Sequence, residues 1–297
     1  MKQHFRIISD GSCDLGAELA AEKGVAIVPF YICFDGEPHK KEIVEQNIQE
    51  FYTRLVENPG LYPKSAAPSP DDFLNLFEQA AQDGEPVVCI CITEKFSSSA
   101  QSARIARDMV LDQHPEARIA VLDSTVNTVL QGIFTLEAVA LRDAGVEFAE
   151  AVRRLEELKS TGRIFFTVGS MDYLRHGGRV GRVAGLVGSM LDIRPLITLK
   201  EGEIHPAGVA RGRRLSREKV LDLARKYILE MGWRPEELRI VIGFGFNREE
   251  AVAFRDELLR TLAWAKDKIE IPLLQIGATI AVHTGPHPLG IGILKRA

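Results

Sequence analysis

Three short polar stretches contain residue types that could bind an anion or transfer a proton. His283 and Thr284 interrupt an apolar run near the end of the chain, and Ser97 and Ser98 follow the apolar run "VVCICIT". Ser65 lies in a proline-containing segment, "PKSAAPSP". A histidine with a serine hydroxyl can hold a carboxylate, or can act as a base with a nucleophile. A core histidine that only bonds a carbonyl group is the structural alternative, so the residues alone leave binding, hydrolysis and packing open.

The serines and two arginines are residue types that favour the binding of an anion. Ser97 and Ser98 stand where a helix is predicted to begin, and free backbone N–H groups at a helix start favour negative charge. The alternative is that one serine merely caps the helix. Arg179 follows two glycines in "HGGRVGR", and Arg211 begins "RGRR". Both arginines could contact a phosphate or an acidic partner, although a solvated helix start is the ordinary explanation for the second cluster.

The sequence lacks the motifs of several common cofactor and catalytic sites. The chain has no phosphate loop, no G-x-S-x-G elbow and no H-E-x-x-H motif. His283 and His287 are four residues apart, but Gly285 and Pro286 between them prevent the helix that would join both on one metal. We therefore expect no metal and no nucleotide cofactor. The cysteines are interpreted as apolar core residues; they are Cys13, Cys33, Cys89 and Cys91.

Composition narrows the class of protein. The formal net charge of −4 argues against a general nucleic-acid-binding protein, which needs clustered positive charge. The sequence has no apolar run of the roughly 18 residues needed for a membrane span, and its first residues do not resemble a signal peptide. These features predict a cytoplasmic protein without stable membrane insertion.

Strands and helices alternate in the first half of the chain, which predicts a parallel sheet with flanking helices. The expected strands are 5–10, 25–34, 86–92 and 118–124. The second half of the chain has a different pattern. Residues 195–210 show the alternation of apolar and polar residues and the central "EGE" turn that are typical of a hairpin. A helix at 216–231, a strand at 238–246, a helix at 248–266 and two last strands complete a mixed sheet. The apolar run before His283 is included among those strands.

We therefore predict a two-domain α/β fold, with an N-terminal domain at 1–163 and a C-terminal domain at 164–297. Ligands of open α/β sheets bind at the carboxyl ends of strands, which is where the serines stand. A ligand site between the two domains is expected. The apolar, small-residue stretch "AGLVGSMLDI" at 184–193 could line a tunnel or allow two backbones to approach.

Motifs in a fixed order along nearly the whole chain resemble the DegV family of bacterial fatty-acid-binding proteins. They are "SDGSCDL", "VPFYICFDGE", "PKSAAPSPDDF", "ITEKFSSSAQSA", "VLDSTVNTVLQG", "LRHGGRVGRVAGLVGSMLDIRPLITLKEGEI", "RGRR" and "HTGPHPLGIG". In this sequence "SAAP" stands where relatives often have Thr-Ser-Gln-Pro, and "SSS" stands for Ser-Gly-Thr. Ser65 keeps a hydroxyl, whereas Ser98 replaces the usual glycine.

The resemblance implies a carrier of one long-chain fatty acid, such as palmitate, without catalysis of its own. Such a carrier presents the acyl chain to a separate fatty acid kinase, which makes an acyl phosphate for phospholipid synthesis. By this resemblance Ser65 and Ser97 bind the carboxylate, beside Ser98, His283 and Thr284. Arg179 falls in the Gly-Gly-Arg motif, and Arg211 corresponds to the arginine linked to the kinase. A small-molecule hydrolase with a Ser/His site is the alternative.

Overall fold

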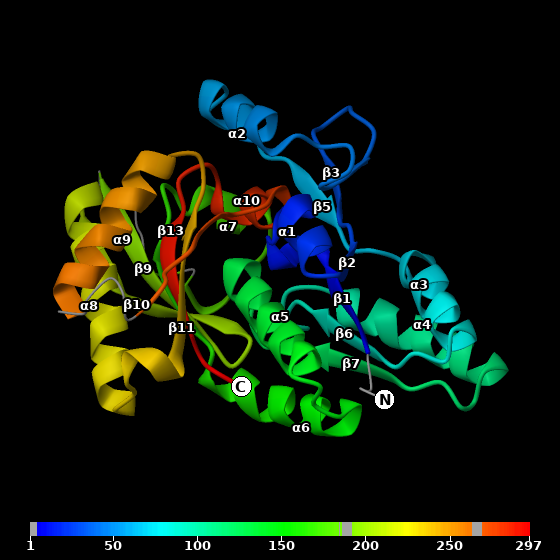
Figure 1. Ribbon diagram of the computed structural model, residues 1–297. Coiled ribbons are helices and arrows are strands. Elements are labelled where there is room, and N and C mark those ends of the chain that lie inside the picture. The colour runs from blue at the N-terminus through cyan, green and yellow to red at the C-terminus, as the bar shows by residue number, and fades with distance from the viewer. Residues whose placement is uncertain (1–4, 184, 186–191, 263–268) are drawn as a thin grey trace.

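The computed structural model describes residues 5–183, 185, 192–262 and 269–297, and Figure 1 shows the arrangement of their helices and strands. These residues form a four-stranded sheet, a six-stranded sheet and a small three-stranded sheet, with helices around and between them. The predicted two-domain α/β class, with a parallel sheet first and a mixed sheet second, is confirmed. Short 3-10 turns occur at Gly11–Cys13, Lys159–Thr161, Gly181–Val183 and Pro235–Glu237.

The first sheet is parallel throughout and has the strand order β2-β1-β6-β7. Its strands are β1 (Arg6–Asp10), β2 (Val25–Val28), β6 (Val87–Cys91) and β7 (Ile119–Asp123). Every residue of β6 is buried, so Cys89 and Cys91 are core residues as predicted. Helices α3 (Pro70–Gln82) and α4 (Ser99–Gln113) cover one face of this sheet, and α1 (Gly16–Glu22) connects β1 to β2.

The segment 25–34 is not the single strand that its apolar residues predict. It divides into β2 and β3 (Tyr31–Cys33), because Pro29 supplies no N–H for a continuing ladder and the chain turns there to a second sheet. This small sheet has the order β4-β3-β5 and is antiparallel, with β4 at Lys40–Lys41 and β5 at Lys64–Ala66. Helix α2 (Ile48–Glu57) packs with it, and Asn47 caps the helix by accepting from the Gln49 and Glu50 amides.

The second sheet has the order β10-β9-β8-β13-β11-β12 and is antiparallel except between β11 and β12. Its strands are β8 (Arg163–Thr167), β9 (Ile193–Lys200), β10 (Glu203–Arg211), β11 (Leu238–Phe244), β12 (Leu273–Gln275) and β13 (Leu289–Lys295). The predicted hairpin is β9 and β10. Helices α8 (Arg213–Met231) and α9 (Arg248–Leu262) bury its outer face, while the predicted extension of α9 to 266 lies outside the described residues.

Helix α5 (Thr128–Asp143) lies between the two large sheets, as Figure 1 shows in green. It is buried along most of its length, which is why its sequence is apolar around nearly the whole circumference. Glu137 is the acidic residue on this helix that becomes buried, and Arg239 of β11 donates to it at 2.5 Å. One helix therefore serves as a wall for both halves of the molecule.

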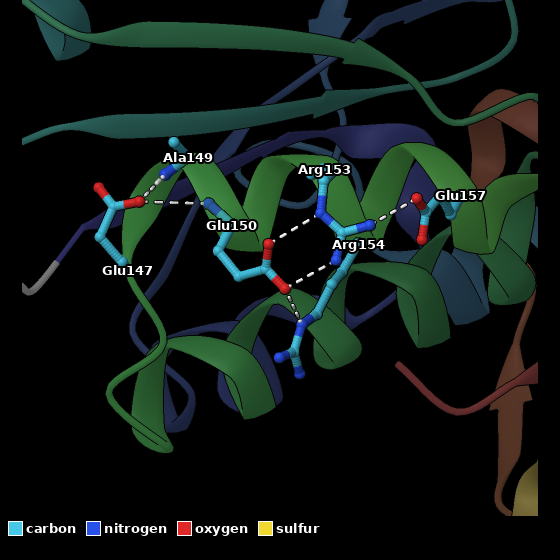
Figure 2. A network of polar contacts seen from close by, with 6 residues as sticks. All are labelled: Glu147, Ala149, Glu150, Arg153, Arg154 and Glu157. Atoms are coloured by element: carbon cyan, nitrogen blue, oxygen red, sulfur yellow. Dashed lines mark hydrogen bonds and ion pairs between the residues drawn. The ribbon is translucent and has the colours of Figure 1, made fainter.

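Helix α6 (Phe148–Leu158) packs on α5 with one face and carries a network of charges on the other (Figure 2). Glu147 caps the helix by accepting from the Ala149 and Glu150 amides. Glu150 accepts from both Arg153 and Arg154, and these two cations hold the pKa of its carboxyl down to about 2. Because opposite charges satisfy each other here, this face is an ordinary solvated helix surface.

The prediction of a strand immediately before His283 is wrong. Residues Ala278–Thr284 form helix α10, which begins after Gly277 and ends at Gly285, where φ is +72°. A short apolar run buried on most sides lacks the polar stripe that distinguishes a helix from a strand. Helix α7 (Asp172–His176), which was not predicted, packs against α10. Both short helices contribute to the site described next.

The last strand of the first sheet ends at Asp123, and the first strand of the second sheet begins at Arg163. Helices α5 and α6 occupy the interval, so the domain boundary at 163 stays a prediction. In the part of the chain that the structure describes, no helix is both long enough and apolar enough to span a bilayer.

Candidate functional site

A cavity of about 170 Å³ lies where the small sheet, the start of α4, α7 and α10 meet. Six of the seven residues predicted for the site line this cavity. They are Ser65, Ser97, Ser98, Arg179, His283 and Thr284. The remaining lining is mostly apolar, and it includes Phe30, Phe96 and Ile280. Residues distant in sequence thus form one pocket with a polar group of side chains and an apolar wall.

His283 is positioned by helix α10 and by the absence of a side chain on Gly177. Its Nε2 atom lies 3.4 Å from the Ser65 hydroxyl oxygen, a long hydrogen bond across the cavity. Its Nδ1 atom is buried and has no hydrogen-bond partner among the described residues. A Cβ atom on Gly177 would lie 2.0 Å from that Nδ1, so the ring occupies space that only glycine leaves free. The second glycine of "HGG", Gly178, has a φ of +68° and turns the chain toward Arg179.

Burial, together with the positive charge of Arg179, lowers the pKa of the His283 imidazole to about 4. The imidazole is therefore neutral near pH 7, and it can donate one hydrogen bond without carrying charge. This protonation state suits a group that holds a carboxylate through hydroxyl and imidazole donors. A hydrolase base must also be neutral, but its second ring nitrogen is normally oriented by a carboxylate, and the Nδ1 atom of His283 has no such partner among the described residues.

Ser97, Ser98 and Ser99 have three different environments at the start of α4. Ser97 is half-buried, and its hydroxyl accepts from the Ser99 amide at 3.2 Å. Ser98 is exposed at the N-cap position and lines the cavity, whereas Ser99 is fully buried. The Ser99 hydroxyl donates to Asp10 at 2.7 Å and thereby ties the start of α4 to the end of β1. One serine can therefore cap the helix while another remains available to bind an anion in the cavity.

The two predicted arginines lie in different places. Arg179 lines the cavity, and its guanidinium donates to the Phe96 carbonyl at 3.1 Å and to the Gly177 carbonyl at 2.9 Å. Arg211 is exposed at the end of β10 and is not one of the residues that line the cavity. Any role for Arg211 must therefore be exercised at the surface.

Two buried carboxylates, Asp10 and Glu42, hold the elements around the cavity in place. Asp10 accepts from the Ser12 and Ser99 hydroxyls, the Ile92 amide and the Gln131 side chain. Glu42 accepts from the Thr279 amide at 2.9 Å and from the Thr279 hydroxyl, which fixes the first turn of α10. Burial raises the pKa of the Asp10 carboxyl, and it raises the pKa of the Glu42 carboxyl to about 7. These side chains hold the elements that carry the serines and His283.

The cavity continues inward into a smaller apolar one of about 50 Å³. The two share five lining residues, which are Asn127, Phe166, Ile204, Ile280 and Thr284. Thr284 is 8% exposed, and its hydroxyl donates to the Ile280 carbonyl at 3.2 Å, so it presents mainly its methyl group and oxygen lone pairs. Beyond these shared residues the inner cavity is enclosed by α5, the second sheet and Ile276.

Other lining residues could not be predicted by motif. Thr279 lies in the run that was interpreted as a strand, and Asn127 precedes α5 in "STVNT". Polar residues after strands were the signal that could have identified Asn127. The predicted tunnel stretch at 184–193 lies largely outside the described residues and stays a prediction. His287 is exposed, as expected for a residue past the turn at Gly285. Within the described residues no group of three or more His, Cys, Asp or Glu side chains is placed to hold a metal ion.

Comparison with known proteins gives a consistent result. The family model described as "Uncharacterised protein, DegV family" matches residues 4–296. A stearic-acid-binding protein from Eubacterium ventriosum is similar in structure at a TM-score of 0.91 and is 37% identical, with 98% of each chain covered.

Two further solved structures share the fold. A DegV family protein from Thermus thermophilus, described as binding fatty acid, is 28% identical at a TM-score of 0.84, with 98% of this chain and 99% of that chain covered. The Streptococcus pneumoniae fatty acid kinase B3 protein, loaded with linoleic acid, has a TM-score of 0.81 over 99% of this chain and 100% of that chain. At 23% identity that last likeness concerns the fold.

Proposed function

Because the chain belongs to the DegV family, we propose that it binds one long-chain fatty acid, with the carboxylate in the outer cavity and the tail directed into the inner one. The observation that supports this proposal most is the graded lining of two joined cavities. Hydroxyls and a neutral imidazole line the outer part, and the inner part is almost entirely apolar. A molecule with one anionic end and a long hydrocarbon body matches that gradient.

The physical terms are favourable for such a ligand. Ser65, Ser97 and His283 offer donors at one end of the cavity, and hydrogen bonds to an ionised acceptor are stronger than neutral ones. Each buried methylene contributes about 0.8 kcal/mol, so a tail of about 16 carbons contributes roughly 12 kcal/mol before ordering costs. The tail therefore supplies most of the affinity, and the polar end sets the orientation.

The first test is to denature the purified protein and identify released lipid by mass spectrometry. We expect about one equivalent of long-chain fatty acid in the wild type. In a fatty-acid displacement assay, the double variant Ser65→Ala with Ser97→Ala should bind at least tenfold more weakly, because the carboxylate loses two donors. Ser160→Ala, a serine on the far turn after α6, is the matched control. A wild type that neither contains nor binds fatty acid would refute the proposal.

We further propose that the protein has no catalysis of its own and presents its ligand to a separate fatty acid kinase, in the cytoplasm. The family resemblance supports this role, and exposed Arg211 is available at the surface for a partner. The hydrolase alternative is disfavoured because the His283 Nδ1 atom has no carboxylate partner among the described residues.

The kinase proposal predicts that Arg211 affects acyl-phosphate formation but not fatty acid binding. With a fatty acid kinase and ATP, Arg211→Ala should lower acyl-phosphate formation about tenfold while leaving fatty acid affinity unchanged. Arg214→Ala, three residues away and paired with Glu218 on the surface, is the control. Equal turnover by wild type and Arg211→Ala would remove Arg211 from the proposed interface.

A further inference from the structure

Part of the wall of the inner cavity is bare backbone, at Gly243. Gly243, Val129 and Ile276 line the inner cavity and are absent from the lining of the outer one. Gly243 lies in β11, beside Gly290 of β13 in the ladder. A Cβ atom on Gly243 would lie 2.9 Å from Val129 Cγ2 and 3.5 Å from Ile276 Cγ1 and Cδ1. These three residues therefore meet at a part of the wall that belongs to the inner cavity alone.

The neighbouring glycines have another role. Gly290 and Gly292 also line the inner cavity, but a Cβ atom on Gly290 would lie 2.9 Å from the Phe165 carbonyl oxygen and 2.6 Å from Phe166 Cβ. A Cβ atom on Gly292 would meet Val241 and Leu130. Gly290 therefore allows β13 to pack closely on β8, and Gly292 allows it to pack closely on β11 and α5. At Gly243, by contrast, the nearest atoms are side-chain tips that themselves face the cavity.

We propose that Gly243, Val129 and Ile276 form a stop that sets the length of the acyl chain, an inference that rests on the proposed binding of a fatty acid. A chain that enters from the outer cavity passes the shared residues Phe166, Ile204 and Ile280 and ends against this stop. Interiors are packed densely, so one added or removed carbon in the wall changes which chain fits. The shape of the stop then selects the substrate, while the polar end accepts any carboxylate.

Two substitutions should change the preference in opposite directions. Gly243→Ala adds a methyl group at the stop, and we expect the affinity for an 18-carbon acid to fall at least about tenfold relative to a 14-carbon acid. Ile276→Val removes one methylene from the wall, and it should raise the affinity for the longer acid about fourfold relative to the shorter one. The lipids that copurify with each variant should move accordingly.

Ile242→Val is the matched control for Ile276→Val. Ile242 precedes Gly243 in β11 and is fully buried in the core on the opposite face of the sheet. The same loss of one methylene there should leave the chain-length preference unchanged. Affinities for saturated acids of 12 to 20 carbons, measured by displacement, and mass spectrometry of copurified lipid supply the readout.

The possible outcomes distinguish a failure of the proposed stop from a failure of the proposed fatty acid binding. If fatty acids bind but neither variant changes the length preference, the stop is refuted and the carrier proposal stands. If the wild type binds no fatty acid of any length, the carrier proposal itself fails. If Gly243→Ala does not fold, Ile276→Val decides alone, since an unchanged preference in that variant overturns the stop.

Discussion

At the scale of single residues, the position of the His283 imidazole depends on a glycine, Gly177, that does not line the cavity. The ring lies against Gly177, and its buried Nδ1 atom has no hydrogen-bond partner among the described residues. A buried polar atom without a partner costs free energy, so this ring is held by packing and by the one long hydrogen bond of its Nε2 atom to Ser65. The orientation of Nε2 toward Ser65 is consequently sensitive to small changes in α7.

Gly177→Ala should displace the ring, because its new Cβ would lie 2.0 Å from Nδ1. We expect at least a tenfold loss of fatty acid affinity in a displacement titration, with the protein still folded by circular dichroism. Gly178→Ala is the control. Its Cβ meets nothing within 4 Å, and its strain comes from a φ of +68° alone. Equal affinity losses in the two variants would contradict the positioning of His283 by Gly177.

At the scale of elements, the start of α10 rests on a carboxyl group that titrates near neutral pH. Glu42 is 3% exposed and accepts from the Thr279 amide and hydroxyl. Burial raises the pKa of its carboxyl from 4.5 to about 7, and the nearby charge of Asp10 contributes. The pKa of Asp14 is likewise raised by burial, with the charge of Glu42 adding to the effect. The folded protein therefore binds protons here that the unfolded chain releases.

This difference in proton binding predicts the direction in which stability changes with pH. Glu42 contributes stability that is fully present below pH 4.5 and is lost as pH rises through about 7. In urea titrations from pH 5 to pH 8, the unfolding free energy of the wild type should decline by about 2 kcal/mol more than that of Glu42→Gln. Glu45→Gln, at an exposed position in the same loop, should follow the wild type. His283 titrates in the opposite sense, since its pKa is lowered, but that contribution cancels between the variants.

At the scale of the whole molecule, an ion pair between a buried glutamate and a partly exposed arginine joins the helix between the sheets to the second sheet. The Glu137 side chain on α5 is 3% exposed, and it accepts from Arg239 of β11 and from the Ala297 amide. Removing one partner of such a pair leaves an uncompensated buried charge. Glu137 lies eight residues after Val129 on α5 and lines neither cavity, so stability and binding can be tested separately.

Arg239→Ala should lower the unfolding free energy by about 1.5 kcal/mol, measured by urea denaturation, because the buried carboxylate keeps only the Ala297 amide as a donor. Arg153→Ala breaks the exposed pairs with Glu150 and Glu157 in Figure 2, and it should have a much smaller effect. A similar loss in both variants would show that Glu137 gains no more from its arginine than a solvated glutamate does.

The sequence predicts the architecture well where patterns are long and periodic. The parallel strands, the hairpin of β9 and β10, and helices α4, α5 and α6 all have a clear period or start signal. The strand predicted before His283 is wrong because a seven-residue segment that is buried on most sides shows no helical stripe of polar residues. The grouping of Ser65, Ser97 and His283 around one cavity follows from the motifs, but the inner cavity is lined in part by Gly243, which no short motif identifies.

The pair formed by Ser65 and His283 has a consequence for how the protein is made. Their contact joins residues separated by 218 positions. At about 10 residues per second, a ribosome adds the histidine about 20 seconds after the serine. Throughout that interval the nascent chain has hydroxyls but no imidazole, and α10 does not yet close the pocket. Fatty acid should therefore be captured only by chains whose synthesis has passed α10, and a truncated product would compete poorly for scarce lipid.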